Sequence, residues 1–237
     1  MDTWIVTGGT RGLGRALVES LMDTGDAVAF CARTKDEVER AEQALRERGV
    51  VMGMAGSIAE RPFVQDFIGR ASALGRVRGL ILNAAQLPNP PLAPVATLDA
   101  ADLRRVFDIN LLGALQVLQE AHPYLTSQRG PRLAAISSDA SWARYPGWAG
   151  YGMSKAALEL LVLTYGAEHP DVPALVIDPG DMDTLMHREA LPEDDSGLRD
   201  PKALAPAIVA LLRSPSAATG RWVFDGTPAG YVSREVK

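Results

Sequence analysis

The chain has 237 residues, a net charge of −5 and a pI near 5.3. This acidic balance argues against a nucleic-acid partner, whose phosphate backbone needs a basic face. No apolar run approaches the roughly 20 residues that cross a membrane, and no basic leader precedes the first apolar segment. One cysteine, Cys31, excludes an internal disulfide and fits a reducing compartment. We therefore expect one domain that works in the cytoplasm.

The first apolar segment, residues 4–7, predicts a strand, and a glycine-rich turn follows it. The turn reads Thr7-Gly-Gly-Thr-Arg-Gly-Leu-Gly14 and leads into an amphipathic helix. Glycines let the backbone bend tightly and approach a phosphate closely. The helix that follows directs its unpaired N–H groups and positive dipole end at that anion. The segment therefore predicts a nucleotide-binding turn.

A second strand is predicted over residues 27–32, with Cys31 buried in it and Arg33 directly after it. In dinucleotide-binding folds an acid near this strand end receives the ribose 2′-hydroxyl, whereas a cation suits a 2′-phosphate. No acid stands here, and Arg11 lies inside the glycine turn. Two guanidinium groups can thus reach one phosphate, which arginine binds in bidentate fashion. The pattern predicts a preference for NADP(H) over NAD(H).

Further elements alternate along the rest of the chain. Apolar runs predict strands over residues 50–54, 79–83, 132–137, 174–178 and 220–225, and amphipathic patterns predict helices over 34–49, 97–122, 150–168 and 200–213. Strands that alternate with helices predict a doubly wound parallel sheet. We find no internal repeat and no second domain.

Three helix starts carry candidate caps. Thr34 and Glu37 predict a capping box, and Asp200 followed by Pro201 predicts an N-cap. Ser57 has two interpretations: it either opens a second capping box, which we favour, or contacts an adenine ring.

Candidate catalytic residues gather in the second half of the chain. Tyr151 and Lys155 are spaced i, i+4 and lie on one helix face. Ser138 ends the fifth strand, where ligands of open parallel sheets bind, and Ser137 is its rival. Asn110 lies inside a predicted helix, where asparagine is a poor helix former. An ammonium beside a phenol lowers its pKa, so Lys155 is expected to activate Tyr151.

These features, taken in order, resemble the short-chain dehydrogenase/reductase family over nearly the whole chain. They are the glycine turn, Asn110, Ser138 thirteen positions before Tyr151, Lys155, and Pro179-Gly180 followed by Thr184. The resemblance implies a Rossmann-like fold with a seven-stranded parallel sheet in a single domain. It also implies an NADP(H)-dependent oxidoreductase that reduces a ketone or aldehyde, or oxidises the corresponding alcohol.

The resemblance assigns roles to individual residues. Tyr151 delivers the proton, Ser138 donates to the carbonyl oxygen, Lys155 also binds the nicotinamide ribose, and Asn110 holds a water of the proton relay. The predicted cofactor-binding residues are Gly8, Thr10, Arg11, Gly12, Leu13, Gly14, Arg33, Ser57, Asn83, Ala84, Tyr151, Lys155, Pro179, Gly180 and Thr184. Ser138, instead of Ser137, matches the family spacing.

The substrate side is predicted from the composition of three loops. The loop between Ser138 and Tyr151 carries two of the four tryptophans, which favours a flat apolar or aromatic carbonyl compound. The predicted substrate residues are Gln86, Trp142, Trp148, Met182 and Leu185. Residues 182–200 resemble the mobile substrate lid of the family.

Two other functions remain open. One is an epimerase or dehydratase on the same fold, which the short region after Pro179 argues against. The other is a non-catalytic NADP-binding regulator. The resemblance implies a homodimer or homotetramer. The scattered histidines, His122, His169 and His187, argue against a metal site.

Overall fold

The computed structural model describes residues 1–127, 129–194, 196–227 and 230–234. Within them, one eight-stranded sheet has the strand order β3-β2-β1-β4-β5-β6-β7-β8. The strands are β1 (Asp2–Thr7), β2 (Ala27–Ala32), β3 (Val51–Ala55), β4 (Arg76–Leu82), β5 (Arg132–Ile136), β6 (Ala174–Asp178), β7 (Gly220–Phe224) and β8 (Tyr231–Arg234). Strands β1 to β7 run parallel, and β8 pairs antiparallel to β7.

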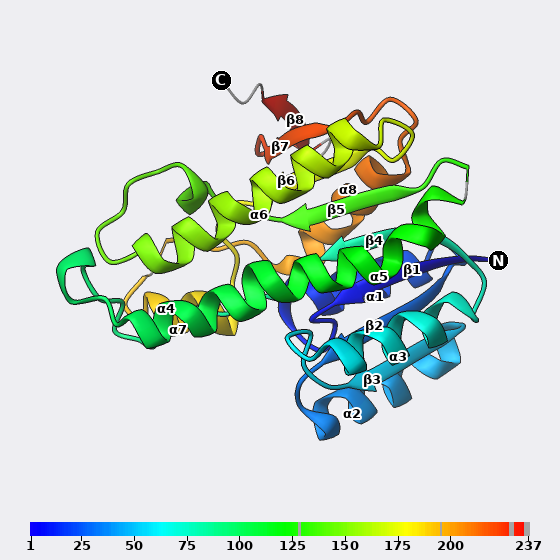
Figure 1. Cartoon of the computed structure of the whole chain (residues 1–237), viewed down its shortest axis with the longest axis horizontal. Coiled ribbons are helices and arrows are strands. Elements are labelled where there is room, and N and C mark those ends of the chain that lie inside the picture. The colour runs from blue at the N-terminus through cyan, green and yellow to red at the C-terminus, as the bar shows by residue number, and fades with distance from the viewer. Residues whose placement is uncertain (128, 195, 228–229, 235–237) are drawn as a thin grey trace.

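Helices cover both faces of this sheet (Figure 1). One face carries α1 (Gly12–Met22), α2 (Lys35–Leu45) and α8 (Pro201–Arg213), and the other carries α3 (Arg61–Ser72), α5 (Ala114–Thr126) and α6 (Ala149–Glu168). Trp4 and Val6 face the first layer, and Ile5 faces the second. The sheet is therefore buried on both sides, which explains why its strands are continuous apolar runs.

The chain changes its direction of winding beside β1. This strand pairs with β2 on one side and with β4 on the other. A crevice forms at such a switch point, beyond the carboxyl ends of the strands. Two short helices, α4 (Ala100–Phe107) and α7 (Leu185–Ala190), lie at that end of the sheet (Figure 1). The topology therefore predicts a ligand site where β1 and β4 end.

The seven strands expected from the sequence all form, and the single-domain α/β fold is confirmed. The eighth strand was not predicted. β8 is only four residues long, and its apolar content is too small to mark it as a strand. Its hairpin with β7 covers what would otherwise be the exposed edge of the parallel sheet.

The prediction of one helix over residues 97–122 is wrong in its middle. Between α4 and α5 the helix widens into a π-helical turn, η3 (Asp108–Gly113), which contains Asn110. Single π turns inside α-helices frequently mark functional sites. Gly113 ends the turn against Ile58, whose Cγ1 would lie 2.8 Å from a Cβ at that position. The poor helix former Asn110 is therefore a feature of a local distortion.

The capping predictions have mixed outcomes. Asp200 caps α8 as expected, because its Oδ1 accepts from Lys202 N at 2.9 Å. The capping box at Thr34 is wrong, since Glu37 accepts from Thr10 Oγ1 at 3.4 Å instead of closing the helix start. The box at Ser57 is also wrong: α3 begins later, after Glu60.

Candidate active site

The glycine turn has the geometry that an anion needs. Gly8 and Gly12 adopt φ values of +73° and +53°, which only glycine tolerates without strain. A Cβ at Gly14 would lie 2.0 Å from the carbonyl oxygen of Gly8, so no side chain fits there. No side chain caps α1 and no acid lies in its first turn. Its N-terminal N–H groups are thus left to a bound phosphate group.

The end of β4 braces this turn. Thr7 Oγ1 accepts from the main-chain N–H groups of Asn83 and Ala84, each at 3.0 Å. Asn83 Nδ2 donates back to the carbonyl oxygens of Thr7 and Gly8, at 2.9 and 3.1 Å. The two strands on either side of the switch point are therefore held together where the cofactor is expected.

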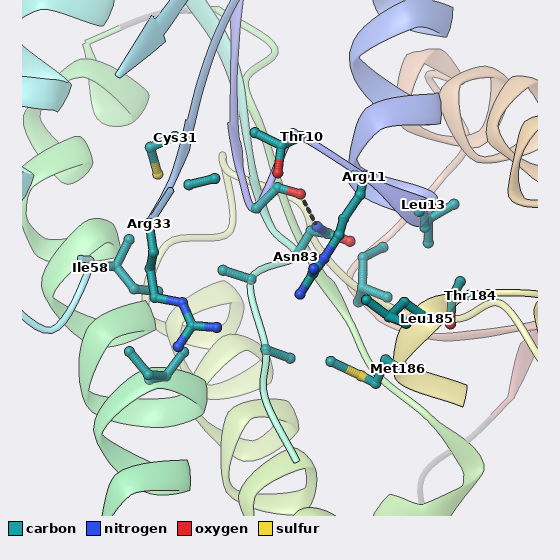
Figure 2. A pocket seen from close by; sticks show the side chains of 18 of the residues that line it. Thr10, Arg11, Leu13, Cys31, Arg33, Ile58, Asn83, Thr184, Leu185 and Met186 are labelled. Carbon is teal, nitrogen blue, oxygen red and sulfur yellow. Dashed lines mark hydrogen bonds between the residues drawn. The ribbon is translucent and has the colours of Figure 1, made fainter. Parts of the chain in front are cut away.

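A cavity of about 330 Å³ opens over the turn. Most of the predicted cofactor residues line it, as do two of the predicted substrate residues, and Figure 2 shows several of them. They are Gly8, Thr10, Arg11, Gly12, Leu13, Gly14, Arg33, Asn83, Ala84, Tyr151, Lys155, Met182, Thr184 and Leu185. Segments from the start, middle and end of the sequence thus meet in one cavity, and its residues fit a dinucleotide.

Other predicted residues lie outside the lining of this cavity. They are Ser57, Gln86, Asn110, Ser138, Trp142, Trp148, Pro179 and Gly180. Conversely, the sequence reading missed Glu37, Ile58, Asp183 and Met186 as lining residues. Glu37 is predicted as part of a capping box, Asp183 has a carboxylate that accepts from Arg188, and Ile58 and Met186 are apolar side chains that no motif marks.

The charges around the nucleotide end of the cavity have both signs. Arg11 and Arg33 enter it from two different segments (Figure 2). Arg33 Nη1 also donates to Gln86 Oε1 at 3.2 Å, which leaves its remaining N–H groups for a ligand. Glu37 adds a carboxylate at this end, which accepts from Thr10 Oγ1 at 3.4 Å. The two arginines favour a 2′-phosphate and Glu37 opposes it.

Tyr151 and Lys155 lie in the first turns of α6 and are both buried, at 8 % and 1 % exposure. Burial lowers the pKa of Lys155 to about 8, while Glu159 opposes that shift. Burial, followed by the negative charges of Asp178 and Asp139, raises the pKa of Tyr151. The net effect on the phenol is the reverse of the expected lowering. Burial thus keeps the Tyr151 phenol protonated and at the same time makes it a weaker acid than free tyrosine.

The two serines after β5 differ in what their hydroxyl groups contact. Ser137 lines the cavity, but its Oγ donates to the Glu159 carboxylate. Ser138 Oγ donates to Asp139 Oδ1 at 3.1 Å and accepts from Ala140 N at 3.2 Å. Ser138 is half-buried, and its hydroxyl can exchange Asp139 for a ligand by rotation. The structure thus favours Ser138 as the available donor.

Asn110 and Gln86 form one buried unit. Asn110 Oδ1 accepts from Gln86 N at 2.9 Å, and its Nδ2 donates to Gln86 O and Ser154 Oγ at 3.0 and 2.9 Å. Gln86 Nε2 donates to Arg105 O at 2.7 Å, and the residue is 7 % exposed. Gln86 is therefore buried behind the cavity lining, in contact with the lining residue Arg33, and is not itself a lining residue.

The tryptophans of the serine loop have different environments. The Trp148 ring meets the Tyr151 ring edge-on, with centroids 5.8 Å apart, and packs in a small apolar cluster with Leu87 and Met186. Trp142 is 59 % exposed. Of the two, only Trp148 lies against a predicted catalytic residue.

The expected lid has paired ends. Met182 and Arg199 form a β-bridge, and Asp183 N donates to Arg199 O at 2.8 Å. Between these ends, His187 Nε2 and Asp194 Oδ2 lie 2.6 Å apart, and this hydrogen bond, together with one from Ser196 N, lowers the pKa of Asp194 to about 2. Thr184 faces the glycine turn, since its Cγ2 would lie 3.5 Å from a Cβ at Gly12.

Two further properties concern the part of the chain that the structure describes. No cluster of three or more His, Cys, Asp or Glu residues there could hold a metal ion. No helix there combines the length and apolarity that crossing a bilayer requires. Cys31 is 1 % exposed, as expected, and burial raises the pKa of its thiol to about 12.

A doubly wound sheet, a phosphate-type glycine turn and a Tyr–Lys pair in one cavity define a dinucleotide-binding enzyme of the Rossmann type. Comparison with known proteins gives the family. The profile of the short chain dehydrogenases matches residues 2–195. The chain therefore belongs to the short-chain dehydrogenase/reductase family and is an oxidoreductase of that family, whose members use NAD(P).

Individual relatives agree with this assignment. An uncharacterised oxidoreductase of Schizosaccharomyces pombe is 30% identical over 188 residues, covering 77% of this chain and 71% of its own. The benzil reductase ((S)-benzoin forming) of Bacillus subtilis is 29% identical over 195 residues, covering 78% and 76%. An alcohol dehydrogenase from the archaeon Thermococcus sibiricus, solved with 5-hydroxy-NADP, superposes with a TM-score of 0.85 at 24% identity, covering 100% and 99% of the two chains. That last similarity shows the fold.

Proposed function

We propose that the protein is an NADP(H)-dependent reductase of a ketone or aldehyde that carries apolar or aromatic groups. One observation carries the proposal: Tyr151 and Lys155 line the same cavity as the glycine turn, Arg11 and Arg33. A phenol, an ammonium and a phosphate-binding turn in one cavity are what carbonyl reduction by a nicotinamide requires.

The chain's own residues do the following in this proposal. A bound NADPH supplies the hydride. Tyr151 gives its phenolic proton to the carbonyl oxygen of the substrate, and Ser138 donates a hydrogen bond to that oxygen as charge develops. Lys155 binds the nicotinamide ribose and stabilises the phenolate that remains after proton transfer. Asn110, whose side chain bonds the main chain of Gln86 and Ser154 Oγ on the helix of Tyr151, holds the water that returns a proton to this relay.

The substrate class rests on Trp148 and its neighbours. Its ring and the Tyr151 ring meet edge to face, and it packs with Leu87 and with Met186, which lines the cavity, so these side chains form an apolar wall behind the phenol. Apolar walls give a pocket its affinity, while a few polar groups orient the ligand. The B. subtilis relative is named a benzil reductase, and benzil bears an aryl ring on each carbonyl. Both observations support an aryl ketone.

The remaining parts of the proposal concern movement and assembly. We propose that residues 182–200 close over the substrate as a lid that pivots on the Met182–Arg199 bridge.

We also propose a homodimer or homotetramer in the cytoplasm. An apolar groove between α5 and α6, lined by Leu115, Leu118, Leu160 and Leu161, supports self-association.

The test is a panel of carbonyl compounds incubated with the purified protein and either NADPH or NADH. Loss of the reduced nicotinamide absorbance should be fastest with NADPH and a diaryl or aryl ketone such as benzil. A non-catalytic regulator would bind NADPH and consume none. An epimerase or dehydratase would convert substrate without net consumption of NADPH, which product analysis by mass spectrometry would detect.

A further inference from the structure

Arg221 is a buried arginine that contacts three segments of the candidate site. Arg221 lies on β7 and is 5 % exposed. Its Nη2 donates to Asp178 Oδ2 at 3.0 Å and to the main-chain carbonyl oxygen of Ser138 at 3.2 Å. Its Nε donates to Glu159 Oε1 at 3.2 Å. The same side chain thus contacts the serine loop, the helix of Tyr151 and the end of β6.

Glu159 accepts hydrogen bonds from serine hydroxyl groups on both sides of Ser138 in the sequence. Its Oε1 accepts from Ser141 Oγ at 2.6 Å and also from Ser137 Oγ. Glu159 stands one helical turn after Lys155 on α6. The carboxylate therefore ties the serine loop, on both sides of Ser138, to the helix that carries the other catalytic residues.

Asp178 makes the corresponding connection to the loop after β6. Its Oδ1 accepts from Gly180 N at 3.1 Å, while its Oδ2 pairs with Arg221. The loop that continues to Thr184 is therefore fixed at its start by the same cluster. Since Arg221 is the shared partner of both carboxylates, the ion cluster acts as one unit.

The carbonyl of Ser138 is the point at which this cluster meets the catalytic chemistry. It accepts from Arg221 Nη2 on one side and from Ser141 N, at 3.1 Å, on the other. Two hydrogen bonds to this carbonyl oxygen restrict the orientation of the peptide plane between Ser138 and Asp139. That orientation in turn restricts the direction of the Ser138 side chain. The Ser138 hydroxyl then moves only by rotation about its own χ1.

We propose that Arg221 is a positioning residue that orients Ser138 toward the substrate carbonyl. The inference rests on the proposed function for what Ser138 does, whereas the contacts that hold the loop are independent of it. Burying an arginine with two carboxylates gains little stability over an apolar core. The three partners of its guanidinium, two carboxylates and the main-chain oxygen of Ser138, all belong to segments that carry candidate site residues, so the cluster can act on the site as well as on stability.

Arg132 offers a matched control. It is also 5 % exposed, but it lies at the start of β5, at the opposite end of the sheet from Ser138. Its guanidinium donates to the main-chain oxygens of Pro131 and Ser214, at 3.0 Å each. Arg132→Met therefore removes a buried arginine of similar exposure without touching the serine loop.

The experiment compares Arg221→Met, Arg221→Lys and Arg132→Met with wild type. The first readout is hydrogen exchange of the peptides that cover residues 137–148, which needs no activity. Arg221→Met should speed exchange there, Arg221→Lys should restore part of the protection, and Arg132→Met should leave the segment at the wild-type rate. Unchanged exchange in Arg221→Met would overturn the proposal.

The second readout separates turnover from cofactor binding. Arg221→Met should lower kcat for ketone reduction by about tenfold or more, because a displaced donor stabilises the transition state poorly. Its Kd for NADPH, measured by fluorescence, should change by a smaller factor than kcat, because Arg221 reaches the loop before Thr184 only through Asp178. Equal losses of kcat in Arg221→Met and Arg132→Met would also overturn the proposal. If Arg221→Met does not fold, the same comparison is made with Arg221→Lys, which keeps one positive charge.

The two claims fail separately. A wild-type protein that binds NADPH but reduces no carbonyl compound would refute the proposed function. The exchange measurement would still show whether Arg221 holds the serine loop.

Discussion

Lys155 donates from Nζ to the main-chain carbonyl oxygen of Ile136 over 2.7 Å, while the same Nζ lies 5.6 Å from the centre of the Tyr151 ring. The ammonium is therefore anchored to the end of β5 before any ligand binds. A lysine fixed in this way needs little reorganisation when a ribose arrives, which is the advantage of a preorganised polar group.

The anchored lysine predicts an unusual dependence of stability on pH. Burial lowers the pKa of Lys155 to about 8, against an ordinary value of 10.5. Below about pH 8 both the folded and the unfolded chain hold the proton, and the folded state carries the full cost of the buried ammonium. Between about pH 8 and 10.5 the unfolded chain binds more protons, so this residue's contribution to the free energy of unfolding rises with pH.

The variant Lys155→Met measures that contribution. It should be more stable than wild type near neutral pH, by at most about 3 kcal/mol, while it loses turnover and cofactor affinity. The difference should shrink as the pH approaches about 10. Thermal unfolding of both proteins across this range checks it. A stability difference that stays constant with pH would contradict the low pKa.

Tyr151→Phe should remove turnover and spare cofactor binding. The ring still packs against Trp148, but the proton donor is gone, and a general acid contributes on the order of a hundredfold or more. Tyr231→Phe, which removes a hydroxyl from a buried tyrosine on β8, is the matched control and should turn over normally. The prediction is checked by measuring kcat and the Kd for NADPH of both variants and of wild type. Retention of more than a few per cent of the rate in Tyr151→Phe would identify another proton donor.

Cofactor preference should change with the charge beside the 2′-position. Ala32→Asp combined with Arg33→Ser supplies a ribose 2′-hydroxyl acceptor and removes a phosphate partner, so kcat/KM should shift toward NADH. Glu37→Gln removes the carboxylate that opposes the phosphate and should strengthen NADPH binding. Titration of each protein with both cofactors tests this. Equal wild-type affinities for NADPH and NADH would refute the preference.

Trp148→Ala should weaken the preference for aryl over small aliphatic ketones. Loss of the ring opens the apolar wall beside Tyr151, and a pocket that loses apolar area loses affinity for bulky ligands. Trp142→Ala should have the smaller effect, because Trp142 is largely exposed. The measurement is kcat/KM for one aryl and one small aliphatic ketone. This view of the pocket would be contradicted if wild type had the higher kcat/KM for the small ketone. It would also be contradicted if the aryl-to-aliphatic ratio of kcat/KM were unchanged in Trp148→Ala.

Self-association should depend on the groove between α5 and α6. Leu160 is 69 % exposed on α6, and Leu160→Glu would place a charge in an apolar interface. Light scattering should report an oligomer for wild type and a smaller species for the variant. Val50→Glu, a change at an exposed position next to β3, should leave the mass unchanged. A wild-type monomer at micromolar concentration would refute the assembly.

Much of the fold could be predicted from the sequence because each pattern that indicates an element lies within a few consecutive residues. Each parallel strand is a short apolar run, and the glycine turn and the Tyr151–Lys155 spacing lie within a few residues. The Arg221 cluster could not be predicted, because its partners Glu159 and Asp178 lie 62 and 43 positions away along the chain. Gln86 is predicted as a substrate residue because it opens a proline-rich loop expected at the mouth of the site. Its burial against Asn110 involves the π-helical turn Asp108–Gly113, which the sequence pattern does not predict.

That distortion also sets the phase between the two halves of a long helix. A π turn holds about one residue more than an α turn, and one residue corresponds to about 100° of rotation. The core-facing side chains of α5, which include Val117, Leu118 and Ala121, meet the sheet only with this offset in place. If all of Asp108–Gly113 formed regular α-helix instead, this apolar stripe would turn by about 100° away from the sheet. A deletion of one residue within the segment should convert the π turn to an α turn and leave the stripe facing the sheet. The π turn thus accommodates one extra residue, with Asn110 among its residues, while both halves of the long helix keep their apolar faces on the protein.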